Sequence, residues 1–137
     1  MKLETSKLYT LQLESNPENV ALVENLIEEL ADKYKFSDDT FANMMICLNE
    51  ATINAIIHGN KCDPHKKVYI NVEIDAKRAI WTIKDVGEGF NYLSLPDPTA
   101  QENIENYTGR GVFILKQLAD QCVFNASGNE VELHFKI

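Results

Sequence analysis

Residues 48–60 read LNEATINAIIHGN, a mostly apolar stretch that carries a carboxylate, an amide and an imidazole at Glu50, Asn54 and His58. Four residues are about one helical turn, so these three polar side chains share one face of a helix. At about 100° per residue, apolar side chains border this polar stripe on both sides, which predicts a buried helix with one polar seam. The two borders consist of Phe41, Met44, Met45, Leu48, Thr52 and Ala55 on one side and Ile46, Ile53 and Ile57 on the other. Taken alone, the stripe fits a functional site and a partly exposed helix face equally well.

Cap signals bound this helix and predict another one before it. Ser37 is a typical N-cap residue, and Gly59 is placed to end the helix. Upstream, Asn16 and Pro17 predict the start of a helix that runs to about Tyr34. Two successive helices are therefore expected in the first 60 residues.

Alternating apolar and polar residues predict the strands. One strand is expected at 7–15, a hairpin at 68–75 and 79–86, and a closing hairpin around the turn at 127–129, after a helix at 111–120. This order has too few crossovers for a doubly wound sheet. It predicts a single domain over the whole chain, an α+β two-layer sandwich with a mixed, mostly antiparallel sheet and helices on one face.

Composition limits the classes of partner and location. Thirteen Lys and Arg against 21 Asp and Glu give a formal net charge of −8, and the basic residues are scattered. Nucleic acid is not an expected partner, because phosphate neutralisation needs a basic stripe. The apolar runs are too short for a membrane span. Three cysteines without a signal-peptide pattern at the start predict free thiols in the cytoplasm.

Two glycine-containing segments lie outside the predicted helices and strands or at their ends. Residues 85–90 read DVGEGF, and glycines at alternate positions after a strand let the backbone approach a ligand closely. Residues 108–111 read TGRG and run straight into a predicted helix, whose first N–H groups can bind an anion. Arg110 is the only basic residue between Asp85 and Lys116, so it is the available counter-charge there. Each segment by itself also fits an ordinary turn or a loop-to-helix junction.

In this order and spacing, the three segments resemble the N, G1 and G2 boxes of the GHKL ATPase and kinase superfamily. The matching residues are E-x-x-x-N-A-I-I-H-G from Glu50, D-x-G-x-G-F from Asp85 and G-R-G from Gly109. Within the superfamily, the chain looks most like the bacterial anti-sigma-factor serine/threonine kinases. The resemblance covers nearly the whole chain and implies the Bergerat ATP-binding fold, with a lid at about 91–110.

The resemblance also implies roles for single residues. Asn54 would coordinate the Mg²⁺ that bridges the ATP phosphates, and Glu50 would act as general base on the attacking hydroxyl. Asp85 would accept a hydrogen bond from the adenine amino group. Further nucleotide contacts are implied for Gly87 and Gly89 beneath the base and for Gly109, Arg110, Gly111 and Val112 at the phosphate-facing end of the lid. For His58 a structural role at the helix end is favoured over a role in the site.

The implied function is that of a Mg²⁺-dependent serine/threonine kinase with ATP as its cofactor. Its substrate would be a small anti-anti-sigma protein of the STAS type, with a sigma-like factor as a second partner and a homodimer as the expected assembly. Two departures from the family pattern stand out. The lid has no Lys or Arg before Arg110, which predicts slow turnover, and the last hairpin has Ser127-Gly128-Asn129 where many relatives place a Gly-Thr pair that helps hold adenine.

Three alternatives remain open from the sequence. The protein could be a nucleotide-binding regulatory switch without kinase activity. A sensor histidine kinase would need a phospho-acceptor on a separate protein. His58, Cys62 and His65 have a spacing that could supply three zinc ligands, although a turn after the helix explains the same residues better.

Overall fold

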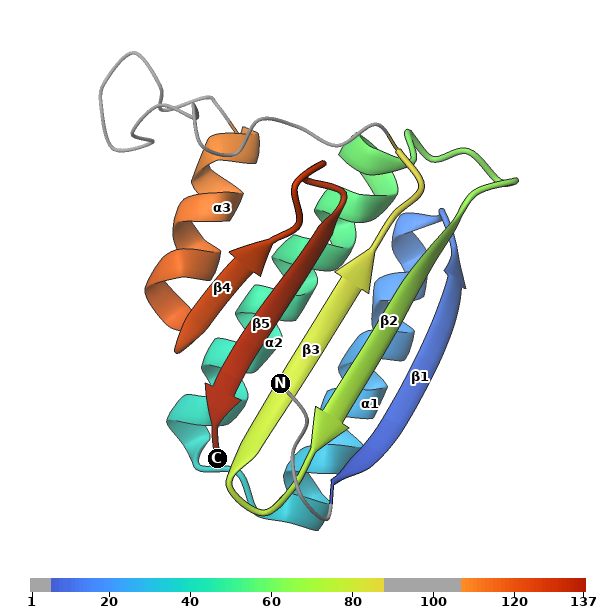
Figure 1. Cartoon of the computed structure of the whole chain (residues 1–137). Coiled ribbons are helices and arrows are strands. Elements are labelled where there is room, and N and C mark those ends of the chain that lie inside the picture. The colour runs from blue at the N-terminus through green and yellow to red at the C-terminus, as the bar shows by residue number, and fades with distance from the viewer. Residues whose placement is uncertain (1–5, 88–106) are drawn as a thin grey trace.

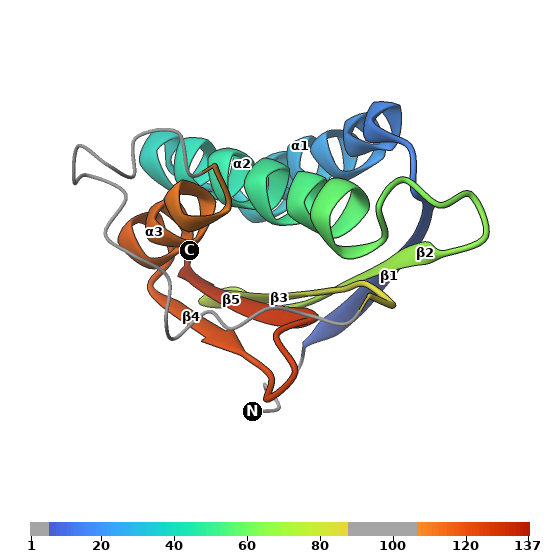
Figure 2. The ribbon, with the colours of Figure 1, turned by 90° about the horizontal axis from the view of Figure 1, so that it is seen from above.

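The computed structural model describes residues 6–87 and 107–137, with only the backbone for 107–110. These residues form two layers, a five-stranded sheet with three α-helices packed on one of its faces (Figures 1 and 2). The helices are α1 (Val20–Tyr34), preceded by the short 3-10 helix η1 (Pro17–Asn19), α2 (Asp38–Ile53) and α3 (Tyr107–Leu118). The strands are β1 (Lys7–Glu14), β2 (Lys67–Ile74), β3 (Arg78–Lys84), β4 (Gln121–Phe124) and β5 (Glu130–Lys136). The predicted α+β two-layer architecture is confirmed.

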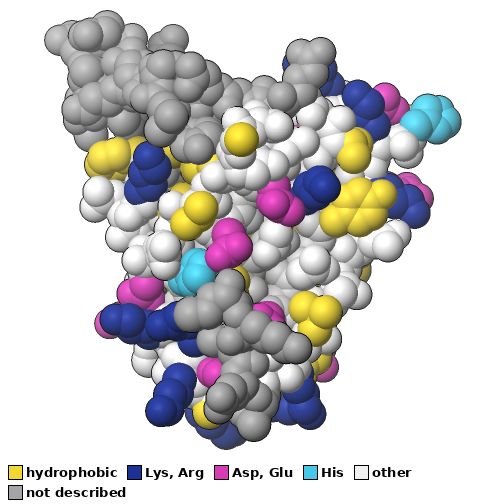
Figure 3. All heavy atoms as spheres, viewed as in Figure 1, with side chains coloured by type: hydrophobic (Ala, Val, Ile, Leu, Met, Phe, Trp, Pro, Cys, Tyr) yellow, Lys and Arg dark blue, Asp and Glu magenta, His cyan; other side chains and the backbone are white. Residues whose placement is uncertain are grey.

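The strand order is β1-β2-β3-β5-β4, and every neighbouring pair in this sheet is antiparallel. Alternation explains how the sheet is sided, because successive side chains on a strand point to opposite faces. On β2, Val68, Ile70, Val72 and Ile74 all point toward the helices and are 0% exposed. Figure 3 shows the opposite face, on which acidic and basic side chains are interspersed. The helices thus cover one apolar face and leave a polar one to solvent.

Side-chain caps mark the start of η1, which leads into α1, and the start of α2, at the residues that the sequence predicts. The Ser37 hydroxyl accepts a hydrogen bond from the backbone N–H of Thr40 at 3.1 Å. The Asn16 side chain accepts one from the N–H of Glu18 at 3.0 Å. α1 ends at Lys35, which takes a left-handed conformation with φ of 56°.

The last part of the second predicted helix differs from an α-helix. Beyond Ile53 the chain continues as a π-helical segment, η2 (Asn54–Gly59), and Asn60 N donates to Ala55 O at 2.8 Å. The helical segment ends at Gly59 as the sequence predicts, and the positive φ angles that follow it fall on Lys61 and Cys62. Gly59 is required at this position, since a Cβ there would lie 2.3 Å from Cγ of Asp85. Such π-turns are frequent at functional sites.

Only one flank of α2 is buried. Met44, Cys47, Leu48, Thr52 and Ile56 pack on the sheet with 0% exposure. The predicted second buried flank is wrong, because Ile46 is 45% exposed and Ile57 is 38% exposed. The helix wheel identifies apolar flanks correctly but does not tell which of them faces the sheet.

The third helix begins earlier than the sequence pattern indicates. α3 starts at Tyr107, so Gly109 and Gly111 lie inside its first turns and not before them. The sequence predicts a helix boundary at these glycines, but Gly111 lies within the helix, where it allows the close approach described below. Gly89 and residues 91–106 of the predicted lid lie outside the described residues. None of the described helices is long and apolar enough to cross a membrane.

Candidate functional site

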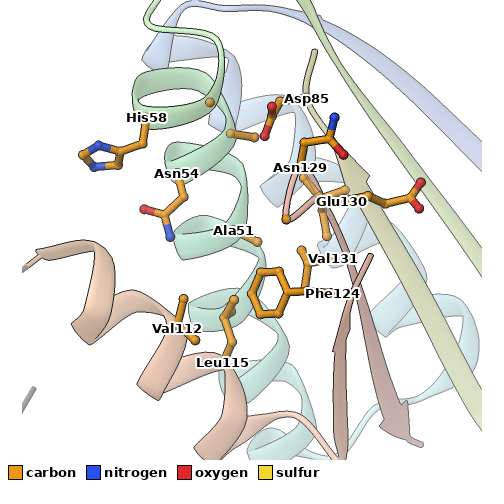
Figure 4. Close-up of a pocket in the computed structure, with 14 residues that line it drawn as sticks. Ala51, Asn54, His58, Asp85, Val112, Leu115, Phe124, Asn129, Glu130 and Val131 are labelled. Atoms are coloured by element: carbon orange, nitrogen blue, oxygen red, sulfur yellow. The ribbon is translucent and has the colours of Figure 1, made fainter. Parts of the chain in front are cut away.

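A cavity of about 170 Å³ opens where η2, α3 and the β4–β5 hairpin meet at one end of the sheet (Figure 4). Its floor is apolar and consists of Ala51, Ala55, Ile83, Leu115, Phe124 and Val131. Its polar lining consists of Asn54, His58, Asp85, Asn129 and Glu130. An apolar floor with a few polar groups around it suits a flat heterocyclic ring that carries a polar tail.

At one end of this site, α3 lies directly on the polar stripe of α2. A Cβ at Gly111 would lie 2.9 Å from Nδ2 of Asn54 and 2.9 Å from Oε2 of Glu50. The structure therefore brings together Glu50, Asn54 and Gly111, which lie far apart in the sequence. Val112, one residue further along α3, is 5% exposed and lines the cavity. Glu50 lies beneath the first turns of α3, and Asn54 lies at the cavity wall itself.

The amide oxygen of Asn54 is a candidate ligand for a cation. Asn54 Oδ1 is buried and has no hydrogen-bond partner among the described residues. Buried polar atoms are nearly always paired, so an orphaned amide oxygen indicates a missing partner. Oxygen atoms of this kind are the ligands that Mg²⁺ prefers. The donor type therefore fits a hard divalent cation at Asn54.

At the other end of the cavity lies Asp85, directly after β3. Its side chain is 8% exposed, and Oδ1 accepts a hydrogen bond from the N–H of Gly87 at 2.8 Å. Burial raises the pKa of the Asp85 carboxyl, against the opposing effects of the Gly87 N–H and of Lys66. A buried carboxylate with a raised pKa in a cavity is typical of ligand-binding and catalytic positions.

Two glycines allow the segment after β3 to pass close to the end of η2. A Cβ at Gly87 would lie 2.2 Å from the carbonyl oxygen of Gly59. Because the neighbour here is backbone, no side-chain movement could make room for it. Together with the contact between Gly59 and Asp85, this approach fixes the carboxylate relative to η2. The sequence singled out Gly87 as a ligand-approach glycine, and the close contact that the structure describes is with the protein itself.

Asn60 is a positioning residue that the sequence did not single out. It is 0% exposed, and its Nδ2 donates to Ser15 Oγ at 3.0 Å and to Lys67 O at 3.1 Å. Its Oδ1 accepts from the N–H of Val86 at 2.9 Å. One side chain thus ties the end of η2 to β1, to β2 and to the segment that carries Asp85. An asparagine directly after a helix is the available sequence signal, but it indicates only a cap.

The β4–β5 turn supplies the second polar group next to Asp85. Asn129 O accepts a hydrogen bond from the N–H of Asp85 at 3.0 Å, and the Asn129 side chain lines the cavity. The turn is held by Asn125, whose Oδ1 accepts from the N–H of Gly128 at 2.7 Å and of Asn129 at 3.0 Å. No periodic pattern marks either asparagine, so the sequence gives only a turn here.

The remaining predicted site residues are placed less completely. His58 is exposed and lines the cavity on the side of Asn54, away from Asp85 (Figure 4). Gly89 lies outside the described residues. Of Gly109 and Arg110, only the backbone is described. Within the described part of the chain, no three His, Cys, Asp or Glu side chains form a group that could hold a metal ion. His58, Cys62 and His65 do not meet, and residues 60–65 form the turn that the sequence favours over a zinc site.

The chain is similar to one protein family and to several curated proteins. The sequence profile of a family described as histidine kinase-like ATPase domain matches residues 13–135. An anti-sigma F factor of Geobacillus sp. (strain WCH70) is 34% identical, and one of Anoxybacillus flavithermus is 32% identical, each over 67% of this chain and 64% of the relative. The chain therefore spans about two-thirds of the length of these relatives. A Bacillus subtilis protein named serine-protein kinase RsbW is 23% identical over 90% of this chain and 81% of its own length.

Proposed function

The chain belongs to the histidine kinase-like ATPase domain family, and on that premise we propose that its cavity binds ATP with Mg²⁺ for transfer of the γ-phosphate to a partner protein. The acceptor is a serine or threonine hydroxyl on a small anti-anti-sigma protein of the STAS type. Relatives named anti-sigma F factor and serine-protein kinase support this assignment. A sigma-like factor is a second proposed partner, and a homodimer is the proposed assembly.

One observation carries the proposal: the two ends of the cavity suit the two ends of ATP. At one end, the buried Asp85 borders an apolar floor, which suits a purine ring. The Asn54 end lies against the first turns of α3, and a helix N-terminus favours phosphate. A nucleotide lying between them has its base at Asp85 and its phosphates beside Asn54.

Asp85 would recognise the base through its exocyclic amino group. A carboxylate accepts hydrogen bonds, so it pairs with the adenine amino group and is mismatched with the guanine carbonyl at the same position. The Asp85 carboxylate lies close to both Gly59 and Gly87, since a Cβ would come 2.3 Å from Cγ of Asp85 at Gly59 and 3.0 Å from its Oδ1 at Gly87. We therefore expect a strong preference for ATP over GTP.

Asn54 would hold the metal that accompanies the phosphates. The orphaned Oδ1 of Asn54 fits an Mg²⁺ ion, which supplies neutralisation of the charge that develops during phosphoryl transfer. Gly109, Arg110, Gly111 and Val112 are the proposed contacts of the phosphates from α3, and Gly89 is a proposed contact of the base. Because no other basic side chain lies between Asp85 and Lys116, charge neutralisation is limited and slow turnover is expected.

Glu50 is proposed as the general base. Its position one helical turn before Asn54 puts a carboxylate next to the group that would orient the phosphates. The partner's hydroxyl oxygen forms a bond to the γ-phosphorus while the bond from γ-phosphorus to the bridging oxygen of ADP breaks. The hydroxyl proton passes to the Glu50 carboxylate, and ADP leaves.

Calorimetric titration with ATP tests the nucleotide part of this proposal. Wild-type protein should bind ATP in the presence of Mg²⁺, and Asn54→Ala should weaken that binding at least about 10-fold while its affinity for adenosine stays within about 2-fold. Equal loss of adenosine affinity would contradict the assignment of Asn54 to the phosphate end. Nucleotide binding without phosphorylation of any STAS-type partner would favour the alternative, a regulatory switch without kinase activity.

A further inference from the structure

We propose that the first turn of α3, residues 107–110, is an autoinhibitory element that holds Glu50 and Asn54 covered and unwinds when the phosphates of ATP bind. The helix would then begin at Gly111, one turn later than in the conformation that the structure describes. The inference rests on the proposed ATP-binding function. It adds a conformational step that controls access to the proposed base and the proposed metal ligand.

Two atoms that the proposed reaction needs are buried in this conformation. They are Oδ1 of Asn54, the proposed ligand of Mg²⁺, and Oε2 of Glu50, an oxygen of the proposed base. A hydrated cation cannot reach the first atom, and an attacking hydroxyl cannot reach the second, unless some part of the protein moves. The described conformation is therefore closed at both atoms.

The backbone of α3 lies against the same two side chains. A Cβ at Gly111 would lie 2.9 Å from Oε2 of Glu50 and 2.9 Å from Nδ2 of Asn54. Gly111 is not the first residue of its helix, because α3 begins four residues earlier, at Tyr107. One complete helical turn thus precedes the point at which α3 contacts the polar stripe of α2.

The part of α3 that follows this turn is anchored in the fold. Val112 is 5% exposed and Leu115 is 1% exposed, and both face the floor of the cavity (Figure 4). Moving the whole helix away from α2 would expose these apolar side chains to water, which is unfavourable. The first turn contains Gly109, and glycine is a poor helix former. Unwinding of this turn is therefore the movement that disturbs the core least.

Unwinding would also supply hydrogen-bond donors for the phosphates. In an α-helix each N–H bonds to the carbonyl four residues before it, so the N–H groups of Gly111 and Val112 are bonded to Tyr107 and Thr108. A helix that begins at Gly111 leaves those two N–H groups free. Its positive end then lies beside Asn54, about 6 Å further along the axis than before. Phosphate oxygens bound there would replace the backbone acceptors that the turn loses.

A matched pair of variants at residue 108 tests whether the helical turn opposes binding. Thr108→Ala and Thr108→Gly both remove the threonine side chain, but alanine favours the helical form about 5-fold more than glycine does. The apparent affinity for ATP follows the fraction of protein in the open form. Calorimetric titration with ATP and Mg²⁺ should therefore show about 5-fold tighter binding for Thr108→Gly than for Thr108→Ala.

The same pair of substitutions at Gln117 is the control. Gln117 is exposed and lies in the part of α3 that stays helical in both forms. Gln117→Ala and Gln117→Gly should differ in thermal stability, because glycine weakens the helix. Their affinities for ATP should agree within about 2-fold, since the helix at this position is the same before and after binding.

Spin labels on α3 measure the unwinding directly. Tyr107→Cys and Gln117→Cys supply the two attachment sites in a Cys62→Ser background, because Cys62 is the exposed native thiol. Ten helical residues span about 15 Å, and unwinding of four of them adds up to about 7 Å. Electron paramagnetic resonance should show a longer distance with ATP and Mg²⁺. Adenosine, which has no phosphates, should leave the distance unchanged.

The outcomes separate this inference from the proposed function. An unchanged label distance at saturating ATP and Mg²⁺ would overturn the inference while ATP binding stands. Equal ATP affinities for Thr108→Ala and Thr108→Gly would also overturn it, because the helical turn would then not oppose binding. If the wild-type protein does not bind ATP at all, the proposed function and this inference are both refuted.

Discussion

At the scale of single residues, Asp85 has an environment that disfavours its charged form. It is 8% exposed, and burial raises the pKa of its carboxyl above the usual 3.8. One backbone N–H, from Gly87, is its hydrogen-bond donor among the described residues. A carboxylate kept in such a position is explained by a ligand that donates a hydrogen bond to it, in line with the common conflict between stability and function at binding sites.

Asp85→Asn should therefore raise the melting temperature of the nucleotide-free protein at pH 7 while abolishing ATP binding. A group with a raised pKa in the folded state stabilises the fold below its unfolded pKa and loses that stabilisation as the pH rises through the folded pKa. Asparagine keeps the oxygen that accepts the Gly87 N–H. The gain should shrink as the pH is lowered from the raised pKa toward 3.8. Thermal unfolding of both proteins at several pH values measures the difference in melting temperature. A lower melting temperature for Asp85→Asn than for wild type at pH 7 would contradict the destabilising role of the buried carboxylate.

The three cysteines should differ sharply in reactivity. Burial, with smaller effects of Cys122 and Glu50, raises the pKa of Cys47 to about 12, and burial raises that of Cys122 to about 11. Cys62 is exposed. Because the thiolate is the reactive form, a disulfide reagent at pH 8 should modify one thiol rapidly in the folded protein. Cys62→Ser should remove that rapid phase, and its persistence in the variant would show that a buried thiol is accessible.

At the scale of elements, the end of the second helix positions the site, because it connects the strands to the segment that carries Asp85. η2 brings Gly59 against Asp85, and Asn60 ties this end to β1, β2 and the segment after β3. The connection is made by one buried amide with three hydrogen bonds. Loss of that amide would leave several buried groups unpaired at once.

Asn60→Ala should lower the free energy of unfolding by about 2 to 4 kcal/mol, because a buried group left without its partner costs about 1 to 3 kcal/mol. The affected groups include Ser15 Oγ and the N–H of Val86. Asn71→Ala, an exposed asparagine on β2, is the control and should change the value by no more than about 0.5 kcal/mol. Urea denaturation provides the comparison. Equal values for the two variants would show that the buried amide has no stabilising role.

The contact between α3 and α2 predicts a variant that separates stability from function. Gly111→Ala places a Cβ 2.9 Å from side-chain atoms of Asn54 and Glu50, which must move. Alanine is the better helix former by about 1 kcal/mol, so the fold should not lose stability. Mg²⁺-dependent ATP affinity should fall at least about 10-fold, since small displacements of positioning groups are costly. Gln117→Ala, exposed on the same helix, should leave the affinity unchanged, and an unchanged affinity in Gly111→Ala would contradict the proposed site.

At the scale of the whole molecule, the site lies where three parts of the two-layer structure meet. The second helix and η2 supply Asn54, the end of β3 supplies Asp85, and the β4–β5 turn supplies Asn129 (Figure 4). Each part contacts another through the interactions given above, so the cavity forms when these elements pack together.

Sequence reasoning reached those parts of the molecule that follow a period or a recognised motif. The strands alternate and the helices have caps, so their places were predicted within a few residues. The closeness of Glu50 and Asn54 to Gly111 followed from a resemblance and not from periodicity. Asn60, Asn125 and Asn129 were not predicted as positioning residues, because a side chain in a turn acquires its partners only from the tertiary fold. The same holds for the exposed flank of α2, since a helical period carries no information about which flank meets the sheet.

The most direct test of the proposed kinase is single-turnover phosphoryl transfer from labelled ATP to a purified STAS-type partner, with wild-type protein and with Glu50→Gln. Glutamine keeps the shape of the side chain but accepts no proton. The rate should fall at least about 100-fold in Glu50→Gln, as expected for loss of a general base, while the affinity for ATP stays within about 3-fold of wild type. Transfer by Glu50→Gln at the wild-type rate would contradict the assignment of Glu50 as the base and with it the proposed mechanism.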